Sequence, residues 1–269
     1  MNYCTISLKP FTAHEIWKSS EGDDSGLLTF SHTSIVAVQN GEIYQGTSKS
    51  RPKDIDEASI MKELSRVPRA DIFPPCPWNF TRAPQIYIKL PDVSLYTPGA
   101  KNDIPQLLLH EAKIYEILRE HPHPNLGQSQ GCVVAEDGRL EGLALLKYKT
   151  TLFERAHDVS SFDLGQREQC ISIIKSALEH LHSLGLAHND LSPFNIMVMD
   201  KGEPVLLDLD VCHPVGTELD KGGQVGDWQG ISRAVYKESS TECDLKALEH
   251  LDMWLKNKYE EMKESVSDE

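Results

Sequence analysis

The sequence predicts an α+β protein with a sheet and attached helices in the first half of the chain and a mainly helical second half. Before residue 150, short runs alternate between apolar and polar residues and are bounded by turn residues, which is typical of half-buried strands. From Arg167 onward, apolar residues recur at intervals of three and four, which is typical of helices. With 269 residues and 39% apolar composition, the chain can bury a core in one large domain or in two smaller lobes.

An Asn-Gly dipeptide marks the first predicted hairpin. Residues 34–38 and 42–44 form its strands, and Asn40-Gly41 between them tolerates the positive φ angles of a tight turn. Apolar residues at helical spacing then predict a helix over residues 55–67. The proline-rich run 73–77 ends that helix and forms a stiff connector.

The remaining predicted elements follow the same two patterns. The strands cover residues 85–90, 132–135, 140–148, 196–199 and 204–207, and the helices cover residues 104–119, 167–184 and 243–256. Gly185 supplies the stop signal for the helix that begins at Arg167. The polar tail from Asn257 onward is expected to fray.

Composition excludes several classes of protein. Acidic residues outnumber basic ones 41 to 27, so the net charge of −14 repels nucleic acid and anionic membranes. The six cysteines lie far apart in the sequence, which predicts free thiols and no paired-cysteine metal or redox motif. The chain has neither a signal-peptide pattern at its start nor a run of eighteen apolar residues, so we expect a cytoplasmic or nuclear protein without a membrane partner.

Two acids and an amide converge where the predicted helix 167–184 meets the hairpin that follows it. The polar loop His188–Asn195 contains Asp190 and Asn195, and the hairpin delivers Asp208 at its end. Phosphoryl transfer requires a carboxylate to orient the attacking hydroxyl and oxygen ligands to hold magnesium on the phosphates. Asp and Asn also favour turns for purely structural reasons, so the residue types alone leave both interpretations open.

The loop resembles the protein-kinase catalytic loop H-x-D-x-x-x-x-N, with Asp208 in the place of the aspartate that begins D-F-G. Four residues separate Asp190 from Asn195 and twelve separate Asn195 from Asp208, as is usual in protein kinases. The resemblance implies that Asp190 is the catalytic base and that Asn195, also a catalytic residue, binds magnesium together with Asp208. ATP and Mg²⁺ are the cofactors it implies.

The resemblance extends to the nucleotide site. Lys89 at the end of a predicted strand looks like the kinase lysine that holds the phosphates, and Glu111 on the next helix looks like its partner. Glu116 is the competing partner, but Glu111 lies on the apolar stripe of the helix. Lys147 and Tyr148, in the connector to the second lobe, are expected to line the nucleotide site.

The resemblance covers roughly residues 30 to 255. Over this range the chain is similar to compact fungal proteins of the protein-kinase-like superfamily. It implies a bilobal protein-kinase-like fold, with an N-terminal sheet lobe over residues 1–145 and a shortened C-terminal helical lobe over residues 146–269. Asp244 would then be the buried helix aspartate that braces the catalytic loop.

Four features depart from the kinase pattern. No G-x-G-x-x-G precedes Lys89, so the phosphate cover would be the shorter hairpin at Asn40-Gly41. Ser192 replaces the lysine typical of Ser/Thr kinases, and Asp208-Leu209-Asp210 replaces D-F-G. Asn189 stands where many regulated kinases carry an arginine that receives a phosphate, which predicts activity without phosphorylation of the following segment. Asn189 could equally serve only to cap a turn.

The first function hypothesis is therefore an ATP-dependent kinase that phosphorylates Ser or Thr hydroxyls on protein. A small-molecule kinase is the alternative favoured by Ser192 and by the short second half. A pseudokinase that acts as a binding module is the third hypothesis. The missing glycine loop favours this third hypothesis. The joint retention of Lys89, Asp190, Asn195 and Asp208 opposes it, because a scaffold has no chemical need for all four.

Overall fold

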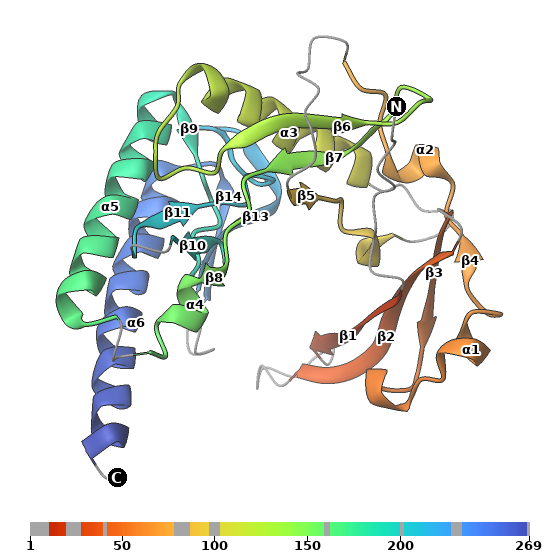
Figure 1. The fold of residues 1–269 in the computed structure, drawn as a ribbon, viewed down its shortest axis with the longest axis horizontal. Coiled ribbons are helices and arrows are strands. Elements are labelled where there is room, and N and C mark those ends of the chain that lie inside the picture. Colours follow the sequence, from red (N-terminus) through yellow and green to blue (C-terminus); the bar gives the residue numbers. More distant parts are fainter. Residues whose placement is uncertain are drawn as a thin grey trace. The chain divides into compact units, whose positions relative to one another are not determined.

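The computed structural model of the chain describes residues 11–19, 28–39, 42–77, 87–96, 103–158, 162–199, 202–226 and 233–267 (Figure 1). It is a mixed α+β structure with several antiparallel sheets, as the sequence predicts. The longer helices are α3 (Ile104–Glu120), α5 (Leu164–Ser183) and α6 (Thr241–Ser267). The short ones are α1 (Glu57–Ile60), α2 (Arg69–Ile72), α4 (Leu152–Arg155) and the 3-10 turns Pro52–Asp54 and Val93–Leu95.

The chain divides into two compact units. The first contains residues up to Leu109 together with Gly131–Ala144, and the second contains His110–Gln130 and the chain from Leu145 onward. Helix α3 thus contributes residues to both units. The lobe boundary near residue 145 and the bilobal kinase arrangement stay predictions.

The first unit is built on an antiparallel sheet with strand order β1-β2-β3-β4. Its strands are β1 (Phe11–Ser19), β2 (Leu28–Gln39), β3 (Glu42–Ser48) and β4 (Ser65–Arg66). The predicted hairpin is confirmed, since Gln39 of β2 pairs with Glu42 of β3. The turn residues Asn40 and Gly41 lie outside the described residues. Strand β1 was not predicted.

The helix predicted over residues 55–67 is wrong for most of its length. Asp56 caps α1 by accepting a hydrogen bond from the Ser59 backbone N–H, but the helix ends at Ile60. Residues 65–66 instead pair with β3, and Arg66 forms an ion pair with Glu42 at 2.7 Å. Pairing with the sheet edge satisfies this backbone better than another helical turn, so tertiary context overrides the local spacing.

A second sheet, most of which belongs to the first unit, has the order β5-β7-β6, with β5 at Tyr87–Lys89, β7 at Leu140–Leu145 and β6 at Ser129–Val134. All three strands were predicted, although β7 ends three residues before Tyr148. A Cβ atom on Gly142 would lie 2.6 Å from the Lys89 carbonyl oxygen. Glycine at this position therefore allows β5 to approach β7 closely.

Helices α5 and α6 lie side by side and form the core of the second unit (Figure 1). Asp163 caps α5 in a capping box with Gln166, and Gly185 follows its end at a φ of 74°. Arg167 of α5 is 1% exposed and donates to the carbonyl oxygens of Phe162, Leu255 and Ala156. The confirmed helix is thus fixed to α6 and to the end of α4.

Helix α6 continues to Ser267, so the expectation that residues 257–267 fray is wrong. Lys258 forms an ion pair with Glu261 at 2.7 Å, and the Arg167 guanidinium lies 5.3 Å from the centre of the Tyr259 ring. This salt bridge within the helix and the contact of Tyr259 with Arg167 of α5 favour the helical form of the polar extension.

The second unit carries short strands that frame one loop. One sheet has the order β11-β10-β8, with β11 at Pro204–Leu206, β10 at Ile196–Val198 and β8 at Thr150–Thr151. Strand β9 (Leu186–Ala187) pairs with β12 (His213–Pro214), and β13 (Glu218–Gly226) pairs with β14 (Arg233–Glu238). Strands β10 and β11 were predicted, whereas β8, β9, β12, β13 and β14 were not. None of the helices in the described ranges has the length and apolar character needed to cross a membrane.

Candidate active site

The residues 188–195 loop is held at both ends by paired strands. Strand β9 leads into it from α5, and β10 leaves it and pairs with β11, with Ile196 opposite Leu206. The Leu207 backbone N–H donates to the Asn195 carbonyl oxygen at 2.8 Å. The predicted hairpin of residues 196–207 is therefore confirmed, and it places Asn195 beside Leu207, the residue that precedes Asp208.

Asp190 and Asn195 are in direct contact. The Asn195 Nδ2 group donates to the Asp190 carbonyl oxygen and to its carboxylate Oδ2, both at 2.9 Å. Within the described residues no group donates a hydrogen bond to the Asn195 Oδ1 atom, so this oxygen can coordinate a cation. The amide thus orients the carboxylate on one side and offers a ligand atom on the other.

The Asp190 carboxylate lies in an environment that disfavours its charge. Burial raises the pKa of Asp190 above its ordinary value, and the nearby carboxylates of Asp208 and Asp210 raise it further. His188 and the hydrogen bond from Asn195 act in the opposite direction. The two neighbouring acids thus disfavour the charged form of Asp190, and a cation bound beside it would favour that form.

Asp208 adopts a left-handed backbone conformation with a φ of 62°, which is uncommon for a residue other than glycine. Both neighbours are anchored. His188 Nε2 donates to the Leu207 carbonyl oxygen at 2.9 Å, and the Leu209 N–H donates to Glu111 Oε1 at 3.2 Å. Such backbone strain persists where the surroundings hold it, and it clusters at functional sites.

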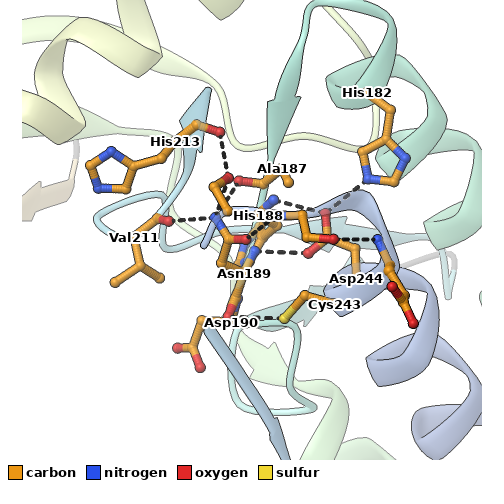
Figure 2. Close-up of polar contacts among 12 residues, drawn as sticks. His182, Ala187, His188, Asn189, Asp190, Val211, His213, Cys243 and Asp244 are labelled. Atoms are coloured by element: carbon orange, nitrogen blue, oxygen red, sulfur yellow. Dashed lines mark hydrogen bonds and ion pairs between the residues drawn. The ribbon is translucent and has the colours of Figure 1, made fainter. Parts of the chain in front are cut away.

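Asp244 at the start of α6 braces the other side of the loop (Figure 2). Its carboxylate is fully buried and accepts the backbone N–H groups of His188 and Asn189, both at 2.8 Å. His182 Nε2 lies 2.9 Å from the same carboxylate. The expectation that Asp244 is a buried helix aspartate bracing the loop is confirmed.

The Asn189 side chain is the centre of a buried hydrogen-bond cluster (Figure 2). Its Nδ2 group donates to the carbonyl oxygens of Ala187 and Val211 and to the Ser239 hydroxyl, at 2.9 to 3.0 Å. Its Oδ1 atom accepts the Ser240 N–H at 3.2 Å. We call Asn189, these three acceptors and Ser240 the Asn189 cluster. The sequence did not predict this cluster. The one signal for it is a polar residue, Asn189, inside a loop that packs against helices.

The predicted nucleotide-binding residues fall in both units. Lys89, partly exposed at the end of β5, belongs to the first unit, and Glu111, 3% exposed on α3, belongs to the second. Lys147 is exposed and Tyr148 is half-buried in the segment between β7 and β8, where burial raises the pKa of the Tyr148 hydroxyl. The pairing of Lys89 with Glu111 stays a prediction, as does nucleotide binding by all four.

Within the part of the chain that the structure describes, no group of three or more His, Cys, Asp or Glu side chains could hold a metal ion by itself. Magnesium in phosphate-transfer sites needs fewer protein ligands, because phosphate and water oxygens complete its coordination. The Asp208 carboxylate and the Asn195 Oδ1 atom are oxygen ligands of the kind that this requirement calls for.

No protein-family model matches the chain. Part of it is similar to serine/threonine-protein kinase 16 of Mus musculus, 37% identical over 125 residues, and to that of Rattus norvegicus, 31% identical over 118 residues. These matches cover 42% and 39% of this chain and 40% and 38% of the relatives. Serine/threonine-protein kinase UCNL of Arabidopsis thaliana is 39% identical over 49 residues, 18% of this chain and 12% of that protein.

The chain thus matches about two fifths of the length of its mammalian relatives. These partial similarities support a relationship to Ser/Thr protein kinases and a kinase-like function. The resemblance to fungal proteins stays a prediction.

Proposed function

We propose that the protein is an ATP- and Mg²⁺-dependent phosphotransferase that acts on Ser or Thr hydroxyls of proteins. The observation that carries the proposal is the contact of Asn195 with the Asp190 carboxylate, next to the strained and anchored Asp208. A carboxylate held by an amide, with a second carboxylate close by, supplies the residue types that phosphoryl transfer requires.

Each residue has a distinct part in this proposal. Asp190 orients the acceptor hydroxyl and receives its proton, which its raised pKa favours. Asp208 and Asn195 Oδ1 would hold magnesium, which neutralises charge on the transferring phosphate. Glu111 holds the backbone beside Asp208 through the Leu209 N–H, so it would act as a positioning residue.

A protein acceptor is favoured over a small molecule because the three similar proteins are Ser/Thr protein kinases by name. Ser192, where kinases carry lysine, is the feature that favours a small-molecule acceptor. Incubation of the protein with labelled Mg-ATP and a cell extract, separated afterwards into protein and metabolite fractions, distinguishes them. Label in protein supports the proposal, label in metabolites supports the alternative, and label in neither fraction indicates a pseudokinase.

The metal assignment is tested by thermal shift. Mg-ATP should raise the melting temperature of the wild type but raise that of Asp208→Ala much less, because the amide of Asn195 cannot replace the lost charge. Asp252→Ala, which removes an acid paired with Lys256 on α6, is the control and should respond like the wild type. An equal response of Asp208→Ala would contradict the metal role.

The nucleotide assignment is tested by a double-mutant cycle. Lys89→Met and Glu111→Ala should each lower the rate of transfer, and the double variant should lose little more than either single variant if the two act as one unit. Fully additive losses would show that the two residues do not share a function.

A further inference from the structure

A cavity opens in the second unit where α3 ends and β6 begins. Its volume is about 220 Å³, roughly that of seven water molecules, so it can hold a ligand of about ten non-hydrogen atoms. All of its lining residues lie between Tyr115 and Gln130, so the cavity belongs to one unit of the chain. The candidate active-site residues Asp190, Asn195 and Asp208 do not line it.

The inner wall of the cavity is apolar and preformed. Leu118 and Leu126 line it, and both side chains are buried. Backbone hydrogen bonds fix the loop before β6 against β11. The Gly127 N–H donates to the Leu206 carbonyl oxygen at 2.8 Å, and the Leu206 N–H donates to that of Asn125 at 2.9 Å. A ligand therefore meets a wall that needs no ordering and that favours an apolar body.

One hydroxyl at this wall lacks a hydrogen-bond acceptor. Tyr115 lines the cavity and is 1% exposed, and its Oη atom has no hydrogen-bond partner among the described residues. A Cβ atom on Gly127, which also lines the cavity, would lie 3.0 Å from this oxygen. Burial, with the nearby carboxylates of Glu111 and Asp208, raises the pKa of the Tyr115 hydroxyl well above its ordinary value, so it stays a donor. A buried donor of this kind calls for an acceptor, which a ligand oxygen can supply.

The rim of the cavity carries hydrogen-bond donors. Arg119 of α3 is exposed, and its Nε atom donates to Glu116 at 3.0 Å, which leaves both Nη groups without a partner among the described residues. The Asn125 N–H donates to His123 Nδ1 at 3.2 Å, so the neutral His123 ring carries its proton on Nε2. None of the lining residues in the described ranges is Asp or Glu, although the net charge of the chain is −14. The two Nη groups form the fork that binds a carboxylate through parallel hydrogen bonds.

We propose that this cavity binds a small organic acid that also carries a hydroxyl or carbonyl oxygen. Arg119 holds the carboxylate, and Tyr115 donates to the second oxygen. The two residues stand four apart on α3, so they share one face of the helix, with about 6 Å between their Cβ atoms. The apolar body of the ligand covers Leu118 and Leu126. The site is independent of the proposed phosphotransferase function.

The test uses para-hydroxybenzoate, a ring acid of the size of the cavity, and follows backbone amide NMR signals of the full chain at low salt. The signals of Gly127 and Ser129 should shift and saturate with a Kd of about 1 mM or below. Arg119→Met should weaken the affinity about tenfold, because it removes charge-assisted hydrogen bonds, and Tyr115→Phe about fivefold. Glu116→Gln should strengthen the affinity about twofold, because Glu116 competes for the guanidinium.

Matched controls separate this site from unspecific binding. Arg155 also pairs with an acid three residues away, Asp158, but does not line the cavity, so Arg155→Met should leave the affinity unchanged. Para-hydroxybenzamide and inorganic phosphate should bind more weakly, because the first lacks the charge and the second the apolar body.

Any one of four results would overturn the inference. These are equal affinity for the amide or for phosphate, equal effects of Arg119→Met and Arg155→Met, unchanged affinity in Tyr115→Phe, and shifts confined to signals outside the cavity. None of these results bears on the phosphotransferase proposal, which is tested by transfer from Mg-ATP.

Discussion

Two carboxylates, Asp190 within the residues 188–195 loop and Asp244 beside it, differ in their burial and in their hydrogen bonds. Asp244 is fully buried, and two backbone N–H groups and one histidine ring surround its oxygens at 2.8 to 2.9 Å. Asp190 is partly exposed, its carboxylate accepts one hydrogen bond from Asn195, and burial together with two neighbouring acids raises its pKa.

The difference separates support from reactivity. A buried charge whose hydrogen-bonding capacity is filled stabilises the fold, whereas a desolvated charge short of donors destabilises the fold and remains available for chemistry. Perturbed pKa values mark functional sites for this reason. We therefore expect the Asp244 side of the loop to govern stability and the Asp190 side to govern activity.

The largest expected effect is on activity. Asp190→Asn should lower the rate of phosphoryl transfer about a thousandfold, because the amide cannot accept the proton of the acceptor hydroxyl. It should leave the affinity for ATP nearly unchanged and the free energy of unfolding at or above that of the wild type. Kinetics and urea denaturation measure both quantities. If Asp190→Asn transfers phosphate at the wild-type rate, or is clearly less stable than the wild type, the Asp190 side of the loop does not govern activity as we expect.

The next effect is on stability. Asp244→Ala should lower the free energy of unfolding by about 3 kcal/mol, because it leaves the His188 and Asn189 N–H groups buried without an acceptor. Urea denaturation measures the loss. Glu242→Ala, an exposed acid in the first turn of the same helix, is the control and should change the stability by less than about 0.5 kcal/mol. Similar losses of stability in Asp244→Ala and Glu242→Ala would show that the hydrogen bonds of Asp244 do not stabilise the loop.

A smaller effect concerns pH. Because the folded-state pKa of Asp190 is raised above its ordinary value of 3.8, the folded state binds the proton more tightly than the unfolded state does. The contribution of Asp190 to stability is therefore lost as the pH rises from 3.8 through the raised pKa. Without divalent cations, Asp190→Asn should gain stability relative to the wild type across this window and hold the gain above it. A constant difference at all pH values would refute the raised pKa.

The smallest expected effect is that of Thr217, the single hydroxyl residue between Val211 and Trp228. The neutral Asn189 cluster already joins the loop to Val211 and Ser239, so we expect the segment to need no phosphate for its order. Thr217→Ala and phosphatase treatment should leave the rate of transfer within about twofold of that of the untreated wild type. A large loss in either would show that Asn189 does not replace a phosphate-binding arginine.

Local patterns predicted those elements whose stability is itself local. The Asn-Gly hairpin, α3 and α5 were found because turn chemistry, caps and apolar spacing all agree within each segment. The failures occur where distant residues decide. Residues 65–66 leave the helical pattern to pair with β3, and the end of α6 is held by Tyr259 against Arg167.

The candidate site follows the same division. The positions of Asp190, Asn195 and Asp208 could be predicted from their spacing, and their roles remain predictions. The Asn189 cluster could not be predicted, because its acceptors at Val211 and Ser239 lie 22 and 50 residues away. The stacked rings of Phe153, Phe194 and Trp254 were missed for a similar reason, since no sequence pattern links these three positions.

The brace by Asp244 also has a consequence for the order in which the protein forms. The carboxylate lies 56 and 55 residues beyond the two N–H groups it binds, so these are non-local contacts that close late in folding. On the ribosome, the residues 188–195 loop is synthesised and released well before α6 is available. A nascent chain can therefore contain every candidate catalytic residue and still lack the loop geometry. The geometry of the loop therefore depends on the docking of α6.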